Sequence, residues 1–297
     1  MILMSQTSNR RNAIKNIVAG SAALAAGAGL SSFKSDMNQP SHALKGNINH
    51  SACRWCYNSI PLEQLCSQFK ELGLVGMDLV GPKDWPMLKK YNLISTMCNG
   101  AELGLTKGWN DKQYHGQLIK NYTEHIDLVA AAGYTNLFCA SGNRGTIDDE
   151  TGLKNCTEGL KQIVAQAEKK GVILVMELLN SKVDHKDYMC DRSTWGVELV
   201  KRVGSPNFKL LYDIYHMQID EGDVIRTIRA NHEYYGHYHT GGVPGRHEID
   251  ETQELYYPAI MKAIHETGFK GYVAQEFIPS APDPIASLRK AIQICDI

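Results

Sequence analysis

The chain has 297 residues and a mass of 33.0 kDa, with 43% hydrophobic and 21% charged residues. This composition supplies enough apolar residues for a sizeable buried core and excludes a fibrous or disordered protein. The formal net charge of −1 and the sequence pI near 6.8 argue against a nucleic-acid partner, because phosphate contacts require an excess of basic residues.

The first 40 residues have the order of an export signal. Arg10 and Arg11 precede an uncharged stretch, residues 16–33, that consists mostly of Ala, Gly and Ser and is too weakly apolar for a bilayer span. This order resembles a twin-arginine signal, whereas an Ala-rich helix docked on the domain would show a polar face at helical period. We predict a signal and spacer at 1–40, a periplasmic protein and no further membrane segment; without a working leader, the protein would be cytoplasmic.

The eight cysteines do not require a disulfide framework, because a chain of this length can be stable without one. Cys53 and Cys56 have the spacing of a redox or zinc pair. No second pair follows at zinc-ribbon distance, so we interpret both as structural residues.

From residue 52 onward, short β-rich apolar runs alternate with longer amphipathic runs. The predicted strands are 52–57, 75–80, 93–98, 135–140, 172–177, 208–213, 234–239 and 272–277. The predicted helices include 61–72, 111–132, 150–170, 194–203, 220–231, 254–266 and 283–294. Several of these helices end at a glycine just before the next strand, which is typical of a left-handed C-terminal cap.

Eight strand–helix units in one chain predict an α/β protein with a single (β/α)8 TIM barrel. A doubly wound open sheet would need a Gly-rich turn after the first strand, and no GxGxxG motif follows it. No Pro-rich or Ser-rich linker interrupts the remaining chain, so residues 41–297 are predicted to form one domain.

Four consecutive predicted strands end in metal-ligand residue types: Glu177, Asp213, His239 and Glu276. The carboxyl ends of barrel strands meet at one mouth, where three carboxylates without a counter-charge would raise one another's pKa. A divalent cation would remove that conflict. Oxygen-rich ligation favours Mg²⁺ or Mn²⁺, with Co²⁺ or Zn²⁺ left open, and the structural alternative is four separate salt bridges or solvated strand ends.

Residues 203–218 (VGSPNFKLLYDIYHMQ), 236–239 (GHYH), 243–248 (VPGRHE) and 271–279 (GYVAQEFIP) carry a resemblance to a known family. The chain resembles the hydroxypyruvate isomerase branch of the xylose isomerase-like barrel superfamily, which also contains tagatose and psicose 3-epimerases and endonuclease IV. The resemblance implies that Glu177 and Glu276 are the catalytic acid/base pair. It also implies that both bind the metal beside Asp213 and His239.

The same resemblance implies that His216 and Arg246 hold substrate oxygens. His239 stands where the isomerase branch commonly has Gln, and His239-Thr240-Gly241 is similar to the 3-epimerase pattern. Arg246 would also suit a substrate carboxylate, which guanidinium binds bidentately. Arg144, Trp55 and Trp109 are further candidates for contacts to the substrate. The polar run after residue 177 (Asn180, Lys182, Asp184 and His185) is expected to form a lid or a solvated loop.

The function that these residues imply is a metal-dependent isomerase acting through an enediolate, most like hydroxypyruvate isomerase, which forms 2-hydroxy-3-oxopropanoate. The alternatives are a ketose 3-epimerase or other sugar isomerase and, more remotely, an endonuclease IV-like phosphodiesterase or a non-catalytic sugar-binding barrel. Export favours a sugar over hydroxypyruvate, which is normally intracellular. The expected partner is a small hydroxy-carbonyl compound or sugar, and a homo-oligomer is left open.

Overall fold

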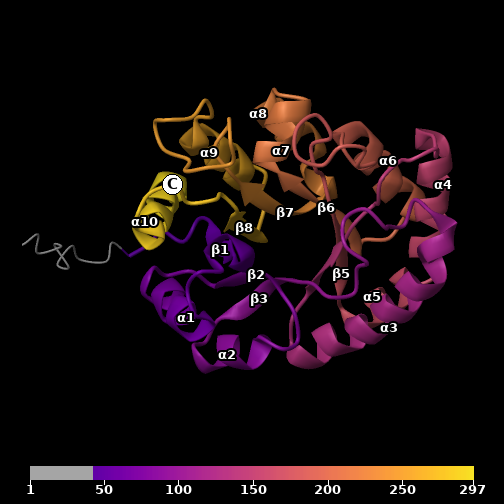
Figure 1. The fold of residues 1–297 in the computed structure, drawn as a ribbon, viewed down its shortest axis with the longest axis horizontal. Helices are drawn as coiled ribbons and strands as arrows, with labels where there is room; N and C mark the ends of the chain where they lie inside the picture. Colours follow the sequence, from indigo (N-terminus) through magenta and orange to yellow (C-terminus); the bar gives the residue numbers. More distant parts are fainter. Residues whose placement is uncertain (1–42) are drawn as a thin grey trace, which may run out of the picture. The chain divides into compact units, whose positions relative to one another are not determined.

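The computed structural model describes residues 43–297 (Figure 1). The predicted signal and spacer at 1–40 lie outside the described residues, so the leader and its boundary stay predictions. Among residues 43–297, no helix is both long enough and apolar enough to cross a bilayer.

The described residues form a closed barrel of eight strands in chain order, and every neighbouring pair is parallel. The strands are β1 (Asn49–Cys53), β2 (Gly76–Val80), β3 (Ile94–Cys98), β4 (Asn136–Cys139), β5 (Ile173–Glu177), β6 (Phe208–Asp213), β7 (Tyr235–Thr240) and β8 (Tyr272–Gln275). The last strand pairs with the first, which closes the ring. The predicted single TIM barrel is therefore confirmed.

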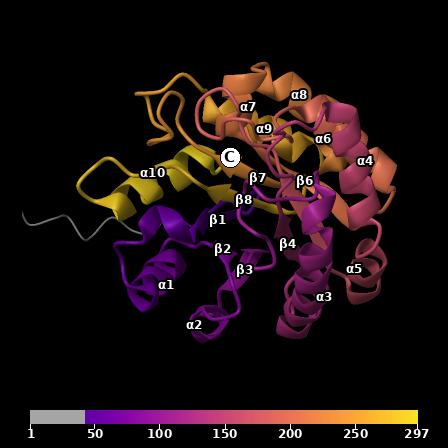
Figure 2. The ribbon, with the colours of Figure 1, turned by 45° about the vertical axis from the view of Figure 1, so that its right-hand side comes forward.

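Helices surround the strands (Figures 1 and 2). They are α1 (Leu62–Glu71), α2 (Trp85–Lys90), α3 (His115–Ala132), α4 (Asp149–Leu160), α5 (Val164–Lys170), α6 (Ser193–Val203), α7 (Ile214–Asp220), α8 (Val224–Asn231), α9 (Tyr257–Glu266) and α10 (Pro284–Cys295). The predicted glycine caps are present at Gly133 and Gly171, which have φ of 80° and 70° in the left-handed region.

Most predicted elements differ from the observed ones by up to a few residues at their ends, and three elements differ in more than their bounds. Strand β1 ends at Cys53, and a short 3-10 helix, η1 (Arg54–Tyr57), follows it. The helix predicted over 150–170 is divided into α4 and α5 by a three-residue turn. The sequence pattern did not indicate this turn, because apolar residues recur on both sides of it. The helix predicted over 220–231 is preceded by α7, and the break between α7 and α8 contains Gly222 with φ of 67°.

Candidate metal and active site

The four predicted ligands meet at the barrel mouth. Glu177 ends β5, Asp213 ends β6, His239 lies near the end of β7, and Glu276 directly follows β8. Each offers one ligand atom, and these atoms all lie within 4.8 Å of one another. All four side chains are buried, with at most 4% of any residue exposed. We call these four residues the cup. The parallel register of β6 and β7 places Asp213 directly beside His239, which brings two of the four residues together.

One imidazole nitrogen lies among the three carboxylates. Nδ1 of His239 is 2.9 Å from Oε2 of Glu276, 3.1 Å from Oε1 of Glu177 and 3.8 Å from Oδ2 of Asp213. The four groups are therefore close enough to bind a single cation together, as the strand-end pattern predicts.

The carboxylates of the cup differ in their electrostatic environment. Burial and the charge of Glu276 raise the pKa of Glu177, and the same two causes raise the pKa of Asp213 well above its usual range. Burial alone would raise the pKa of Glu276 too, but the charges of Arg246 and His239 outweigh it and lower that pKa well below normal. Glu276 is thus held charged while Glu177 and Asp213 lack sufficient positive charge.

The donor set fits a divalent cation. Three carboxylates and one imidazole are hard or borderline ligands, which suit Mg²⁺ or Mn²⁺ and do not exclude Co²⁺ or Zn²⁺. Within the described residues, Oδ2 of Asp213 is a buried oxygen without a hydrogen-bond partner. A buried polar atom of this kind is costly unless something binds it, and a cation among the ligand atoms of the cup would do so.

Arg246 reaches the cup from the loop between β7 and α9. Its Nη2 donates a hydrogen bond to Oε2 of Glu276 and lies 3.8 Å from Oδ2 of Asp213. The guanidinium carbon lies 5.1 Å from the ring centroid of Trp55 and 5.5 Å from that of Tyr215, so the group is held between two aromatic rings.

His216 lies in the first turn of α7, next to the cup. Oδ1 of Asp213 accepts the backbone N–H of His216 at 3.0 Å and caps the helix, which ties the two residues together. Burial and the charge of Arg246 lower the pKa of His216 well below its usual value, so the ring is neutral. Nε2 lies 3.8 Å from Oδ2 of Asp213.

Asn180 determines which nitrogen of His216 carries the proton. The amide oxygen of Asn180 accepts from the backbone N–H groups of Val183 and Asp184, so its amino group is the one that faces Nδ1 of His216, at 2.6 Å. Nδ1 therefore accepts a hydrogen bond, and the proton of the neutral ring is on Nε2. This Nε2 is buried and has no hydrogen-bond partner among residues 43–297, so it is free to donate a hydrogen bond to a ligand.

The remaining sequence candidates have different positions. Trp55 donates its indole N–H to Oε1 of Glu276 at 2.8 Å, so it contacts the cup directly. Trp109 is fully buried against Tyr122, with ring centroids 5.2 Å apart, and is a packing residue. Arg144 is engaged by Asp149 and Asp191 rather than directed at the cup.

The polar run after β5 is partly buried rather than simply solvated. Asp184 accepts hydrogen bonds from the Asn180 amide and the Tyr215 hydroxyl, both at distances below 3 Å. The ring of His185 lies 5.1 Å from that of His216, whereas Lys182 is exposed and donates to backbone carbonyls of α7.

All eight cysteines lie in the described part of the chain as free thiols, and burial raises the pKa of Cys53 and Cys56.

Asp78 is next to the cup but is not among the residues predicted from the sequence. This fully buried carboxylate lies within β2, and its Oδ2 is 3.1 Å from Nε2 of His239. Burial alone would raise the pKa of Asp78, but His237 and His239 lower it below its usual value. Burial alone would lower the pKa of His239, but the acidic groups around the ring raise it. A single acid inside an otherwise apolar strand was the available signal.

Comparisons with known proteins agree with the fold and the motifs. The family described as Xylose isomerase-like TIM barrel matches residues 86–295. The 2-oxo-tetronate isomerase of Cupriavidus necator is 35% identical over 124 residues, or 42% of this chain and 47% of the relative. The D-psicose 3-epimerase of Ruminiclostridium cellulolyticum is 30% identical over 172 residues, or 56% of this chain and 55% of the relative.

A protein of Homo sapiens with the name "Putative hydroxypyruvate isomerase" is 29% identical over 122 residues, or 41% of this chain and 44% of that protein. The chain thus spans about half the length of the curated relatives it matches. Among solved structures, an AP endonuclease of family 2 from Brucella melitensis has a TM-score of 0.74 at 24% identity, covering 81% of this chain and 97% of that chain. At this identity the likeness shows the fold alone.

Proposed function

Because the chain belongs to the xylose isomerase-like TIM barrel family, we propose that it is a metal-dependent isomerase of a small hydroxy-carbonyl compound. The proposed substrate is hydroxypyruvate, converted to 2-hydroxy-3-oxopropanoate. The observation that carries the proposal is a pair of buried glutamates, Glu177 and Glu276, whose pKa values are shifted in opposite directions around one imidazole. Such a pair is typical of acid/base catalysis.

The reaction requires one proton to move between neighbouring carbons. A base removes a proton from the hydroxymethyl carbon, and the electron pair forms the enediolate as negative charge moves onto the carbonyl oxygen. A proton then returns to the former carbonyl carbon. The hydroxyl proton passes to the oxygen that carries the negative charge, which gives the aldehyde and the new hydroxyl group. A divalent cation in the cup would supply positive charge beside the two reacting oxygens.

Glu177 and Glu276 are the two groups that would take and return the proton. Glu177 is the stronger base when ionised, because its pKa is the higher of the two. Glu276 is held in place by the Trp55 indole and by Arg246, which limits the directions in which its carboxylate can act.

His216 and Arg246 are the proposed substrate contacts. The free Nε2–H of neutral His216 can donate to a substrate oxygen without first losing or gaining a proton. Nε of Arg246 is likewise buried and has no hydrogen-bond partner in the described chain, although Nη2 is bound to Glu276. An unused guanidinium donor supports a substrate with a carboxylate or another electron-rich oxygen.

A ketose 3-epimerase is the second candidate. The match to the D-psicose 3-epimerase extends over 172 residues, compared with 124 for the 2-oxo-tetronate isomerase, and His239 is similar to the epimerase pattern. Epimerisation would use the same two glutamates on opposite faces of one carbon. A phosphodiesterase is less favoured, since the cup of the described structure contains one imidazole and the chain has no basic excess.

Deuterium exchange tests the function. Hydroxypyruvate, ketoses and aldoses are incubated with the protein and Mg²⁺ in D₂O, and proton NMR reads where label enters. We expect Glu177→Gln and Glu276→Gln each to lower exchange by about 10³-fold, within the usual range for a lost acid/base group. Glu63→Gln is the matched control, because Glu63 is an exposed carboxylate of α1 that pairs with Lys90 of α2. This variant should keep the wild-type rate.

The position of the label separates the candidates. Label at the former carbonyl carbon supports the isomerase, and label at carbon 3 of a ketose with inverted configuration supports the epimerase. Wild-type exchange in both glutamine variants contradicts the proposed bases, and sugar binding without any exchange would support a non-catalytic barrel. We also propose export through residues 1–40, which would favour the sugar substrate of the second candidate over hydroxypyruvate. Periplasmic fractionation of the full chain with and without Arg10→Lys/Arg11→Lys tests the export.

A further inference from the structure

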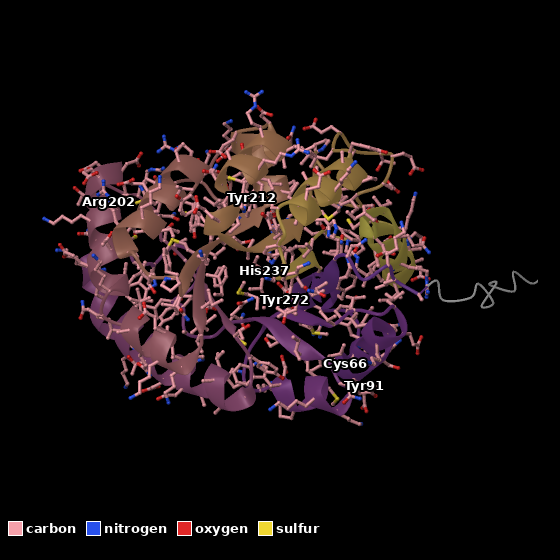
Figure 3. The ribbon with its side chains drawn as sticks, turned by 180° about the vertical axis from the view of Figure 1, so that it is seen from behind. Cys66, Tyr91, Arg202, Tyr212, His237 and Tyr272 are labelled. Carbon is pink, nitrogen blue, oxygen red and sulfur yellow. The ribbon has the colours of Figure 1, made fainter. Side chains whose placement is uncertain are left out.

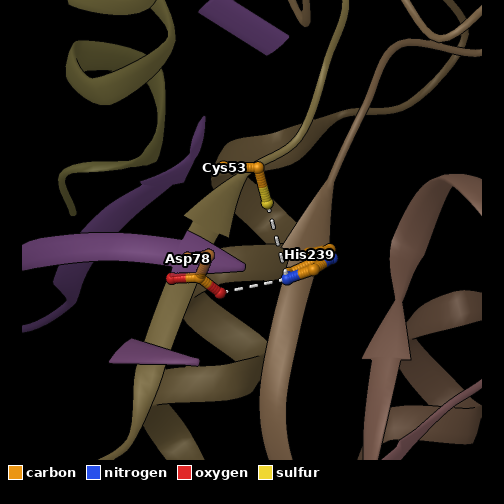
Figure 4. Close-up of side chains that lie close together, drawn as sticks. All are labelled: Cys53, Asp78 and His239. Carbon is orange, nitrogen blue, oxygen red and sulfur yellow. Dashed lines mark hydrogen bonds and ion pairs between the residues drawn. The ribbon is translucent and has the colours of Figure 1, made fainter. Parts of the chain in front are cut away.

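The two ring nitrogens of His239 face different surroundings. Nδ1 is directed at the carboxylates of the cup, at the distances given above. Nε2 is directed away from it, 3.1 Å from Oδ2 of Asp78 and 3.8 Å from Sγ of Cys53 (Figure 4). A ring in this position can bind a cation in the cup only through Nδ1, so the group beside Nε2 controls how the ring acts as a ligand.

The oxygens of Asp78 are divided between two kinds of donor. Oδ1 accepts a hydrogen bond from the hydroxyl of Ser51 at 2.8 Å and another from the hydroxyl of Thr96. Oδ2 faces Nε2 of His239 and also lies 2.5 Å from Nε2 of His237. His237 is itself held by packing, with its ring centroid 6.2 Å from that of Tyr272 (Figure 3). The carboxylate is therefore fixed from four sides.

We propose that Asp78 is a positioning residue for the metal site, because it accepts the Nε2–H of His239 and so, in the neutral ring that binds a cation, keeps Nδ1 unprotonated and directed at the cup. A metal-bound imidazole must present a nitrogen without a proton, and a carboxylate on the other nitrogen determines both the tautomer and the ring orientation. This inference rests on the proposed function in one respect, namely that the cup binds a cation.

A different arrangement of the same residues would be a second metal centre. Cys53, Asp78 and His239 each offer a ligand atom, and these lie within 4.8 Å of one another. The hydrogen bonds favour the positioning role, because both oxygens of Asp78 already have donors and the carboxylate needs no cation to compensate its burial. The two arrangements differ in the number of ions bound.

Asp78→Asn tests the proposal while preserving the size of the side chain. We expect the amide oxygen to take the place of Oδ1, where two hydroxyls donate, which puts the amino group against the imidazoles. The amino group donates to Nε2 of His239 and favours the proton on Nδ1, the tautomer that cannot bind a cation. Mn²⁺ binding by isothermal titration calorimetry should weaken by about 10-fold to 100-fold, with one ion still bound.

Cys53→Ala is the matched control, because Cys53 contacts the same ring nitrogen without providing a carboxylate. It should bind one Mn²⁺ with the wild-type affinity. Wild-type affinity in a folded Asp78→Asn variant overturns the proposal. Two ions in the wild type, with one lost in both variants, also overturns it and assigns a second metal centre instead.

A measurement on the unmodified protein covers the case in which Asp78→Asn does not fold. With Mg²⁺ bound and histidine labelled with ¹⁵N, NMR should show the His239 ring with its proton on Nε2, and loss of the signal in His239→Gln assigns it. A proton on Nδ1, or no binding of Mn²⁺ or Mg²⁺ at all, overturns the proposal. Cation binding that depends on Asp78, without deuterium exchange in any compound tested, would reject the proposed reaction and leave the role of Asp78 intact.

Discussion

The two halves of the barrel contribute different chemistry to the cup. Strands β5 to β8 place their acids and His239 at or beside the strand end, where the side chains meet one another. Strands β1 to β3 place polar groups within the strand instead, as Ser51, Asp78 and Thr96 show. In our proposals, the first group of residues binds the cation, whereas the second holds the residues that bind it.

The halves also differ in how they compensate buried charge. The carboxylates of the second half have the positive charges of Arg246 and His239 beside them, but Oδ2 of Asp213 has no hydrogen-bond partner in the described chain, and the proposed cation would compensate it. In the first half, Asp78 is satisfied by hydroxyls and imidazoles. His50 in β1 lies 3.8 Å from Asp296, and burial lowers its pKa to about 4. Removing a residue from each half should therefore have different consequences.

The largest effect is expected for Asp213→Asn. This change removes a charged ligand but keeps a side chain that can cap α7, since Asn is as good a capping residue as Asp. We expect Mn²⁺ affinity to fall by about 100-fold and exchange with solvent to fall by about 10³-fold. Calorimetry and the NMR assay measure the two quantities, with Asp223→Asn, at an exposed ion pair with Arg226, as control. Unchanged Mn²⁺ affinity would remove Asp213 from the ligand set.

A smaller effect, confined to catalysis, is expected for His216→Phe. The ring shape is retained but the free Nε2–H is lost, which should lower kcat/KM by about 10²-fold, as for other single donors to a developing negative charge. Mn²⁺ affinity should stay at the wild-type value, because His216 is not a ligand. If affinity falls together with kcat/KM, His216 supports the metal site rather than the substrate.

The smallest effect concerns stability and lies in the first half, at His50. Its folded-state pKa of about 4 is below the ordinary value of 6.5, so between these values the unfolded state binds a proton and the folded state does not. Stability is therefore lost as pH falls, by about 2 kcal/mol between pH 7 and pH 5 from this residue alone. Urea unfolding at both pH values should show a shallower loss for His50→Gln than for the wild type. An equal loss in both proteins would mean that His50 is not buried in its neutral form.

Much of the second half could be predicted because its signals are local. The predicted strand 208–213 coincides with β6, and 172–177 exceeds β5 by one residue, since apolar runs and the acids that end them are neighbours in the chain. The first half was harder to predict. Asp78 lies inside an apolar strand, and nothing near it in sequence indicates that its partners are in β1, β3 and β7. The turn between α4 and α5 was also not predicted, because the helical pattern of apolar residues continues on both sides of it.

The sequence by itself determined the barrel and which four residues meet at its mouth, because the strands, the helix caps and the strand-end residues are each specified by short segments of the chain. Only the tertiary structure decided which nitrogen of His239 faces the cup, which proton His216 carries and what holds Asp78. The contact between His239 and Asp78 arises across the barrel interior, where closure brings together β2 and β7, two strands that are not neighbours in the sheet. The proton position on His216 depends on Asn180, which lies 36 residues earlier in the chain, in the loop after β5. Contacts of that kind depend on how the ring closes and leave no periodic trace in the sequence.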